Sequence, residues 1–238
     1  MPAQIQENDP RIEHETVSFD GASGAISAYV AKPAGADNAP AVIIIHENKG
    51  LQPHLKDVAR RAAAAGFIAV APDFQSQVGG TPEDPDEAVE KTRSLDMAKI
   101  VGDAVAAAAY ARGRADSNGK VGSIGFCWGG ALSNQLAVHD PDLDAGVVFY
   151  GRSPADEDVP KIKARMLLNY GGLDENINAT VPGFEAAMKA AGTDYTLYTY
   201  DGAKHAFHND DNPDRHHPDS AALAWSRTMD FLKETLAS

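Results

Sequence analysis

Short apolar runs alternate with amphipathic stretches along most of the chain. Runs of four to six mostly apolar residues, several of them rich in β-branched side chains, are typical of strands buried in a parallel sheet. They occur at 41–45, 67–71, 121–124, 145–150, 166–170 and 195–200. Stretches with helical periodicity or helix-ending glycines lie between them, at 53–65, 97–112, 128–139, 181–191 and 219–236. This alternation predicts an α/β fold with a doubly wound, mostly parallel sheet and helices on both faces.

Two regions depart from this rhythm. Residues 14–19 and 25–31 alternate apolar and polar positions around Gly21 and Gly24, which predicts an antiparallel hairpin at the edge of the sheet. Residues 75–85 form a polar segment rich in Gly and Pro, and we interpret the acidic cluster at 83–87 as a solvated loop and helix start. Ser117-Asn118-Gly119 predicts a turn. We expect one domain over residues 1–238, with residues 1–12 loosely ordered.

Composition narrows the classes of partner. Among 238 residues there are 34 acidic and 21 basic ones, a formal charge of −13, and no local basic patch. Such a chain repels nucleic acids and anionic membranes. No apolar run approaches the roughly 20 residues of a membrane span, and the polar start does not resemble a secretory signal. A single cysteine excludes an internal disulfide, so we expect a cytoplasmic protein.

The segment Gly125-Phe126-Cys127-Trp128-Gly129 follows a predicted strand and begins a predicted helix. It has the G-x-C-x-G pattern, the cysteine form of the nucleophile elbow. The sharp turn leaves room only for small residues two positions on either side of Cys127. A thiolate at a helix N-terminus is also favoured by the helix dipole. Taken alone, Cys127 could equally be a small buried apolar residue in a glycine-rich turn.

Other reactive groups follow other strands. Asp174 comes after 166–170, His205 after 195–200, and Glu47 after 41–45. The carboxyl ends of parallel strands meet at one edge of a sheet, so these side chains are candidates for a common site. The order nucleophile, acid, histidine is that of α/β-hydrolase triads, in which histidine takes the proton of the nucleophile and the acid orients histidine.

Two backbone amides are candidates for an oxyanion hole: that of Trp128, directly after the nucleophile, and that of Asn48, in the loop after 41–45. Metal binding is not expected. His46-Glu47 lacks the second histidine of a zinc helix, because Gly50 stands in its place. His216 and His217 lie in a Pro/Asp-rich loop and have weak ligand spacing.

These motifs together resemble the dienelactone hydrolase (carboxymethylenebutenolidase) family of the α/β-hydrolase superfamily. The likeness rests on four segments and extends from about Val17 to the last helix. The segments are Ile44-Ile45-His46-Glu47-Asn48, the elbow through Gly130, Gly171-Gly172-Leu173-Asp174, and Gly202-Ala203-Lys204-His205-Ala206-Phe207. The resemblance implies the α/β-hydrolase fold and a triad of Cys127, His205 and Asp174. It also implies that Glu47 contacts the thiol and assists thiolate formation when substrate binds.

One departure concerns substrate. The best-known relatives hold a substrate carboxylate with two arginines, and the matching positions here are Gln77 and Asn209, neither of them charged. Lys49, Arg152 and Lys204 lie near strand ends and are candidate replacements, although surface charges often contribute little. Tyr150, at the end of the predicted strand 145–150, is a further candidate substrate contact.

The sequence therefore predicts a hydrolase of small-molecule esters or lactones that acts through a cysteine acyl-enzyme and needs no cofactor. The alternative is a non-catalytic protein on the same fold that binds a small molecule or senses oxidants through its thiol. Nothing in the sequence decides the oligomeric state.

Overall fold

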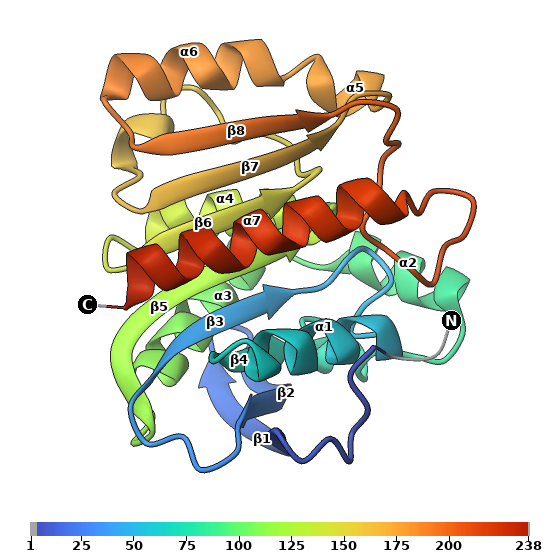
Figure 1. Cartoon of the computed structure of the whole chain (residues 1–238), viewed down its shortest axis with the longest axis vertical. Coiled ribbons are helices and arrows are strands. Elements are labelled where there is room, and N and C mark those ends of the chain that lie inside the picture. The colour runs from blue at the N-terminus through green and yellow to red at the C-terminus, as the bar shows by residue number, and fades with distance from the viewer. Residues whose placement is uncertain (1–3, 238) are drawn as a thin grey trace. The chain divides into compact units, whose positions relative to one another are not determined.

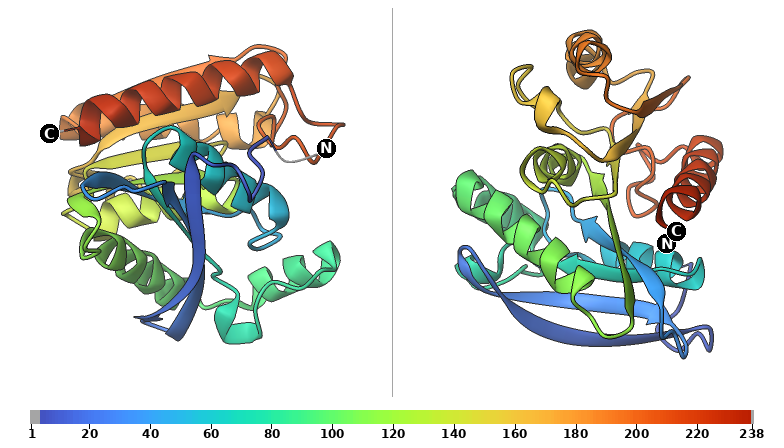
Figure 2. Two further views of the ribbon diagram at one scale, coloured as in Figure 1. Left: turned by 60° about the horizontal axis from the view of Figure 1, so that its bottom comes forward. Right: turned by 90° about the vertical axis from the view of Figure 1, so that its left-hand side faces the viewer.

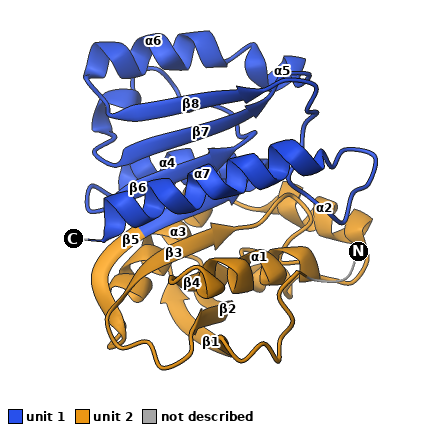
Figure 3. Ribbon diagram, in the orientation of Figure 1, with its two compact units in different colours: residues 1, 122–238 blue, residues 2–121 orange. Residues whose placement is uncertain are grey.

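The computed structural model describes residues 4–237, and these residues alternate strands and helices much as the sequence pattern predicts (Figure 1). They fall into two compact units, one reaching to Val121 and the other beginning at Gly122 (Figure 3). Strand β5 (Ser117–Phe126) contributes its first half to one unit and its second half to the other.

The first unit is built on an antiparallel hairpin and two parallel strands. β1 (Ile12–Gly21) pairs along its whole length with β2 (Gly24–Pro33), and the hairpin predicted at the sheet edge is confirmed. β2 is antiparallel to β4 (Ile68–Pro72), which runs parallel to β3 (Ala39–Ile45). Most of β3 and all of β4 are buried, as their continuous apolar sequences require.

Helices cover both faces of these strands. α1 (Pro53–Ala64) packs on β2 and β4, whereas α3 (Met97–Arg112) packs on β1 and β3 from the opposite side (Figure 2). The polar segment after β4 contains a short 3₁₀ turn, η1 (Ser76–Val78), and then α2 (Pro85–Ser94). The extent of α2 could not be predicted from the periodicity of apolar residues, because this helix buries only Ala88 and Thr92. Its start at the acidic cluster is explained by Asp84, whose side chain accepts hydrogen bonds from the first-turn amides.

The second unit is wholly parallel. β5 pairs with β6 (Ala145–Phe149), β6 with β7 (Arg165–Gly171), and β7 with β8 (Tyr195–Tyr200). α4 (Trp128–His139) packs on β6, and α7 (Pro218–Leu236) packs on β6 and β7 from the other face (Figure 2). The remaining helices are η2 (Val159–Lys161), α5 (Glu175–Asn178) and α6 (Val181–Ala191).

Two local expectations need correction or restriction. Ser117-Asn118-Gly119 is the first part of β5 and not a separate turn, although Gly119 keeps a positive φ of 85°. Of the N-terminal segment expected to be loosely ordered, residues 1–3 lie outside the described residues. From Gln4 onward it is attached to α1, because the amides of Gln4 and Ile5 donate to the Asp57 carboxylate at 3.1 and 2.9 Å.

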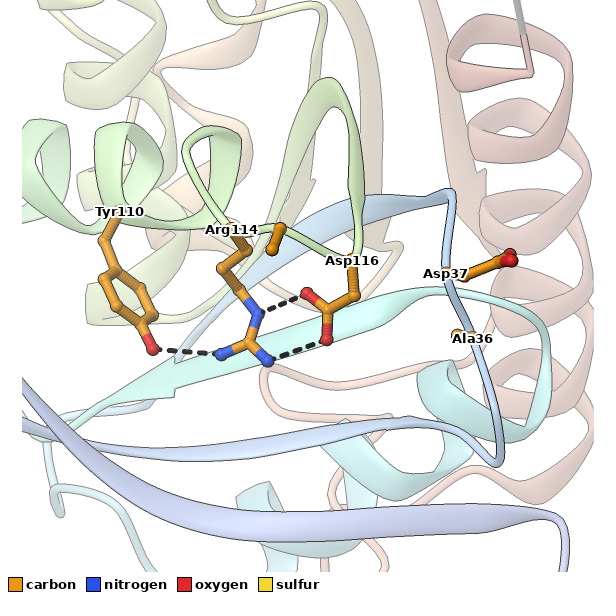
Figure 4. Close-up of a pocket in the computed structure, with 6 residues that line it drawn as sticks. Ala36, Asp37, Tyr110, Arg114 and Asp116 are labelled. Atoms are coloured by element: carbon orange, nitrogen blue, oxygen red, sulfur yellow. Dashed lines mark hydrogen bonds and ion pairs between the residues drawn. The ribbon is translucent and has the colours of Figure 1, made fainter.

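A charged cavity of about 460 Å³ lies in the first unit, where α3 leads into β5 (Figure 4). The Arg114 guanidinium donates two hydrogen bonds to the Asp116 carboxylate, at 2.8 and 2.9 Å, and one to the Tyr110 hydroxyl at 2.9 Å. Lys32 adds a second cation 3.0 Å from Asp116. These contacts lower the pKa of Asp116 to about 2, chiefly through the hydrogen bonds from Arg114.

Candidate active site

The nucleophile elbow forms where β5 ends and α4 begins. Cys127 lies between Phe126, the last residue of β5, and Trp128, the first of α4. Its backbone has φ 54° and ψ −112°, which is rare for a residue with a side chain. The Cys127 amide donates to the Phe149 carbonyl at 3.0 Å, and this bond fixes the turn on the neighbouring strand β6. The predicted strand–turn–helix context of the G-x-C-x-G pattern is therefore present.

The glycines of the elbow are required by close backbone contacts. A Cβ on Gly125 would lie 2.0 Å from the carbonyl oxygen of Gly129. A Cβ on Gly130 would lie 2.7 Å from the Phe149 carbonyl oxygen and 2.8 Å from Cα of Gly151. A side chain at Gly125 would clash with the start of α4, and one at Gly130 would clash with the end of β6 and the residues after it. The small residues predicted around the nucleophile thus have a direct steric cause.

The loops that carry the acid and the histidine are joined to each other. In the loop after β7, the amides of Gly172 and Leu173 donate to the carbonyls of Tyr200 and Ala203, at 2.8 and 2.9 Å. A Cβ on Gly171 would lie 2.7 Å from the Ala203 carbonyl oxygen, so the two loops touch through their backbones. Asp174 and His205 are consequently held at a fixed separation, although they lie on different strand ends.

The structure brings Cys127, His205 and Asp174 into one chain of contacts. Nδ1 of His205 lies 2.6 Å from Oδ2 of Asp174, and Nε2 lies 3.0 Å from Sγ of Cys127. A carboxylate only accepts hydrogen bonds, so Nδ1 carries a hydrogen and Nε2 can accept the thiol proton. Asp174 is 7% exposed, and the His205 side chain is partly exposed. Such an arrangement can deprotonate a thiol and later return the proton.

Aromatic side chains pack around the histidine. The ring of Tyr150 lies 5.1 Å from the His205 imidazole, centre to centre, and 5.5 Å from the ring of Phe207. Tyr150 is fully buried and directly follows β6. Tyr150 and Ala206 both have positive φ, at 41° and 64°, and each such backbone conformation costs about 1–3 kcal/mol. The candidate substrate contact Tyr150 therefore lies against the imidazole, with no exposed surface of its own.

The candidate residues Glu47, Asn48 and Lys49 belong to the first unit, where they follow β3. His46 is fully buried; its Nε2 accepts from the Phe74 amide at 3.2 Å, and its Nδ1 lies 2.7 Å from the Glu47 carbonyl. Burial lowers the pKa of His46 below its usual range, so this imidazole is neutral and fixes the loop. Glu47 is 8% exposed, Asn48 is half-buried and Lys49 is exposed.

A cavity of about 710 Å³ adjoins the catalytic candidates in the second unit. His205 and Asp174 form part of its wall, together with Lys204. Sequence reasoning missed its other walls, namely Leu173, Glu175, Asn176, Ile177, Asp214 and Arg215. Of these residues, Leu173 is the one that the sequence could have suggested, because it is an apolar residue in a loop after a predicted strand. In the structure it is 59% exposed. Arg215 stands in a Pro/Asp-rich loop with no pattern to mark it.

The remaining predicted substrate contacts are engaged locally or exposed. Gln77 lies in η1, and its side-chain amide donates to the Ala25 carbonyl of the hairpin at 2.8 Å. The side-chain carbonyl of Asn209 accepts from the Asp211 amide at 3.0 Å in a local turn. The Arg152 side chain is exposed, and its carbonyl accepts from Asn134 at 3.0 Å.

Within residues 4–237, no group of three or more histidine, cysteine or carboxylate side chains has the geometry to hold a metal ion. His217 instead caps α7 by accepting a hydrogen bond from the Ser220 amide. No helix in this part of the chain has the length and apolar character to cross a membrane.

Comparison with known proteins gives one consistent result. The family model for the dienelactone hydrolase family matches residues 26–236. A Methylorubrum extorquens protein named "Putative carboxymethylenebutenolidase" is 35% identical over 227 residues, which cover 89% of this chain and 77% of the relative.

Solved structures agree with it. A Klebsiella pneumoniae structure named "Putative Dienelactone Hydrolase" is 28% identical, with a TM-score of 0.84 and coverage of 95% and 99% of the two chains. The dienelactone hydrolase of Anabaena variabilis shares the fold at 24% identity, with a TM-score of 0.74 and the same coverage. The predicted α/β-hydrolase fold is thereby confirmed.

Proposed function

Because this chain belongs to the dienelactone hydrolase family, we propose that it hydrolyses carboxylic esters or lactones through a cysteine acyl-enzyme. The observation that carries the proposal is the contact chain Cys127–His205–Asp174, with separations of 3.0 and 2.6 Å. Both distances are within hydrogen-bond reach, which nucleophile and base require. A neutral histidine oriented by a carboxylate is the partner that makes a thiol nucleophilic at neutral pH.

The reaction follows from these positions. His205 Nε2 takes the thiol proton, and Sγ of Cys127 attacks the carbonyl carbon, whose π electrons move to the oxygen. When the tetrahedral intermediate collapses, the alcohol oxygen leaves with the proton from Nε2, and a thioester remains on Cys127. Water then attacks the thioester carbonyl while Nε2 takes its proton. Collapse of this second intermediate releases the acid and restores the thiol.

Two further roles belong to the proposal. The amides of Trp128 and Asn48 would stabilise the oxyanion; Trp128 opens α4, so its N–H points toward the start of the helix. Glu47 would influence the charge state of the thiol, because a nearby carboxylate opposes formation of a second anion. The cavity beside His205 is large enough for the alcohol portion of a small ester, since ligand cavities span roughly 300–1,000 Å³. The reaction needs a reduced Cys127, which fits a cytoplasmic location.

Mass spectrometry tests the nucleophile directly. We expect p-nitrophenyl acetate to acetylate the native protein transiently at Cys127, and Cys127→Ala to lose both the adduct and turnover. Removal of a nucleophile leaves roughly 10³–10⁴-fold acceleration over water at best, far below native activity. A Cys127→Ala variant that keeps most of its activity would show the assignment to be wrong. Oxidation of Cys127 without acylation would favour the thiol-sensing alternative.

A further inference from the structure

Strained backbone positions converge on the proposed triad. Within residues 4–237, the non-glycine residues with positive φ are Cys127, Tyr150 and Ala206. Such positions persist where the surrounding structure enforces them, and they concentrate at functional sites. Cys127 is the proposed nucleophile, and Ala206 directly follows His205. Tyr150 is the only one of the three that is neither a residue of the proposed triad nor next to one in the sequence.

The backbone around Tyr150 is fixed on both sides. Its own amide donates to the Asn169 carbonyl on β7 at 2.8 Å. The preceding residue, Phe149, accepts the hydrogen bond from the Cys127 amide. The following residue, Gly151, lies so near the elbow that a Cβ on it would be 2.3 Å from the carbonyl carbon of Gly130. Tyr150 is thus held by the peptide groups that also hold the nucleophile.

The side chain of Tyr150 carries this fixed point to the histidine. Its ring and the His205 imidazole are inclined by 58° with centres 5.1 Å apart, and the ring has no exposed surface. The rings of Phe126 and Phe207 pack near the same ring, with centres 6.3 and 5.5 Å from its centre. A ring packed in this way cannot rotate freely. It therefore forms a rigid wall against one side of the imidazole.

We propose that Tyr150 is a positioning residue, which holds the His205 imidazole so that Nε2 stays directed at Sγ of Cys127. This inference rests on the proposed function, and it replaces the expected substrate contact of Tyr150 with contact to the base. The positive φ follows from the same arrangement, because it directs the ring toward His205 while the neighbouring peptides stay bonded to the elbow and β7. Asp174 fixes one nitrogen of the imidazole, and Tyr150 fixes the tilt of its plane.

The test separates the ring from the backbone. Tyr150→Gly removes the ring at a position where glycine adopts positive φ without strain. Tyr150→Phe keeps the ring, and Tyr198→Ala is the control, since Tyr198 contacts Tyr200 and Arg227. Two readouts are measured: kcat and KM for p-nitrophenyl acetate, and the alkylation rate of Cys127 by iodoacetamide from pH 5 to 9. The second reports the thiol–imidazole pair independently of turnover.

For Tyr150→Gly we expect kcat to fall about ten- to a hundredfold with little change in KM, the penalty of misplacing a catalytic group by about 1 Å. We also expect the midpoint of the alkylation profile to move. Tyr150→Phe should restore both values to within about threefold of native, since orientation rather than binding is at stake. Tyr198→Ala should leave both unchanged. Should Tyr150→Gly fail to fold, Tyr150→Asn replaces it, because asparagine also tolerates positive φ.

Two results would overturn the inference. An unchanged kcat and midpoint in Tyr150→Gly would show that the ring does not position His205. A raised KM with unchanged kcat would show that Tyr150 contacts the substrate instead. A flat alkylation profile in the native protein is a different outcome, because it would contradict the Cys127–His205 pair and with it the proposed function.

Discussion

Two of the aspartates that pair with a basic side chain, Asp174 and Asp116, have partners with different chemistry. Asp174 lies 2.6 Å from His205 in the second unit, and Asp116 receives two bonds of 2.8 and 2.9 Å from Arg114 in the first. All three contacts are within hydrogen-bond distance. The partners differ, however, since a guanidinium remains charged at every accessible pH, whereas an imidazole exchanges its proton near neutrality. The Arg114–Asp116 pair can therefore act only in the fold, whereas in the proposed reaction the His205–Asp174 pair takes up and returns a proton.

The two basic side chains also differ in their other contacts. Arg114 also donates to the Tyr110 hydroxyl, as Figure 4 shows, and to the Glu15 carboxylate. Most of the N–H groups of the guanidinium therefore have partners within the fold. His205 turns its second nitrogen to Cys127 and leaves part of its ring exposed. The residue after it has the strained φ of 64°. The guanidinium of the structural pair thus spends its donors on the fold, while the imidazole of the proposed catalytic pair directs its second nitrogen to a third group.

The largest expected effect is a difference in kcat/KM between two variants that each remove the charge of one of these aspartates. Asp174→Asn should lower kcat/KM about a thousandfold, because the amide no longer stabilises the imidazolium or selects the Nδ1–H tautomer. Asp116→Asn should leave kcat/KM within about twofold, as substitutions outside the reacting groups usually do. Steady-state hydrolysis of p-nitrophenyl acetate by both variants measures the difference. Equal losses in the two variants would contradict the distinction between them.

The second effect is on stability and concerns Asp116. Its pKa is lowered from an ordinary value near 4 to about 2. A carboxylate with a depressed pKa stabilises the fold above its unfolded pKa, and this contribution disappears as pH falls from about 4 to about 2. A shift of this size corresponds to about 2 kcal/mol.

Urea unfolding of Asp116→Asn should therefore show a loss of about 1–2 kcal/mol at pH 7 that shrinks toward pH 3. Asp37→Asn is the matched control, since Asp37 lines the same cavity and is exposed. It should unfold like the native protein at both values. A deficit in Asp116→Asn that is the same at pH 7 and pH 3 would rule out charge pairing as its cause.

Much of the second unit could be predicted from sequence because its signals are local. The G-x-C-x-G pattern is recognised by its glycines, and the structure shows why they are needed: Gly125 lies too close to Gly129 for a side chain. α6 and β8 lie at the predicted residues because a glycine ends the one and a run of β-favouring residues forms the other. The triad candidates followed from strand order, since parallel strands bring their carboxyl ends to one edge.

What the sequence could not reveal depends on contacts between distant residues. The buried side chain of Gln75 donates to Ala88 and Thr92 of α2, at 2.7 and 2.8 Å, and no periodicity in that polar helix signals it. The positive φ of Tyr150 depends on hydrogen bonds to β7 and at the elbow, so its place at a strand end did not reveal the direction of its ring. The cavity wall formed by Arg215 and Glu175 likewise exists only once two loops meet.

The smallest effect that we expect is that of a carboxylate on the substrate. It tests whether a cation beside His205 is free to bind a ligand, unlike Arg114, which is bonded within the fold. Two cations, Lys204 and Arg215, line the cavity beside His205. Three carboxylates line it as well, namely Asp174, Glu175 and Asp214, so its wall carries no excess of positive charge. The positions that we match to the substrate-binding arginines of this family hold two uncharged residues. Gln77 donates to the Ala25 carbonyl of the hairpin, and Asn209 accepts from the Asp211 amide. A bidentate cation on a substrate carboxylate contributes roughly 1.5–3 kcal/mol per hydrogen bond, and this contribution should be missing here.

We therefore expect neutral esters to be hydrolysed with kcat/KM within about tenfold of carboxylate-bearing esters that have the same leaving alcohol, a difference below about 1.4 kcal/mol. Measuring kcat/KM for such matched pairs at two salt concentrations provides the check, with Arg215→Gln as the informative variant. A preference above about a hundredfold for the carboxylate that Arg215→Gln abolishes would identify Arg215 as an anion anchor, and Arg215 would then resemble His205, not Arg114, in keeping a group available for a ligand.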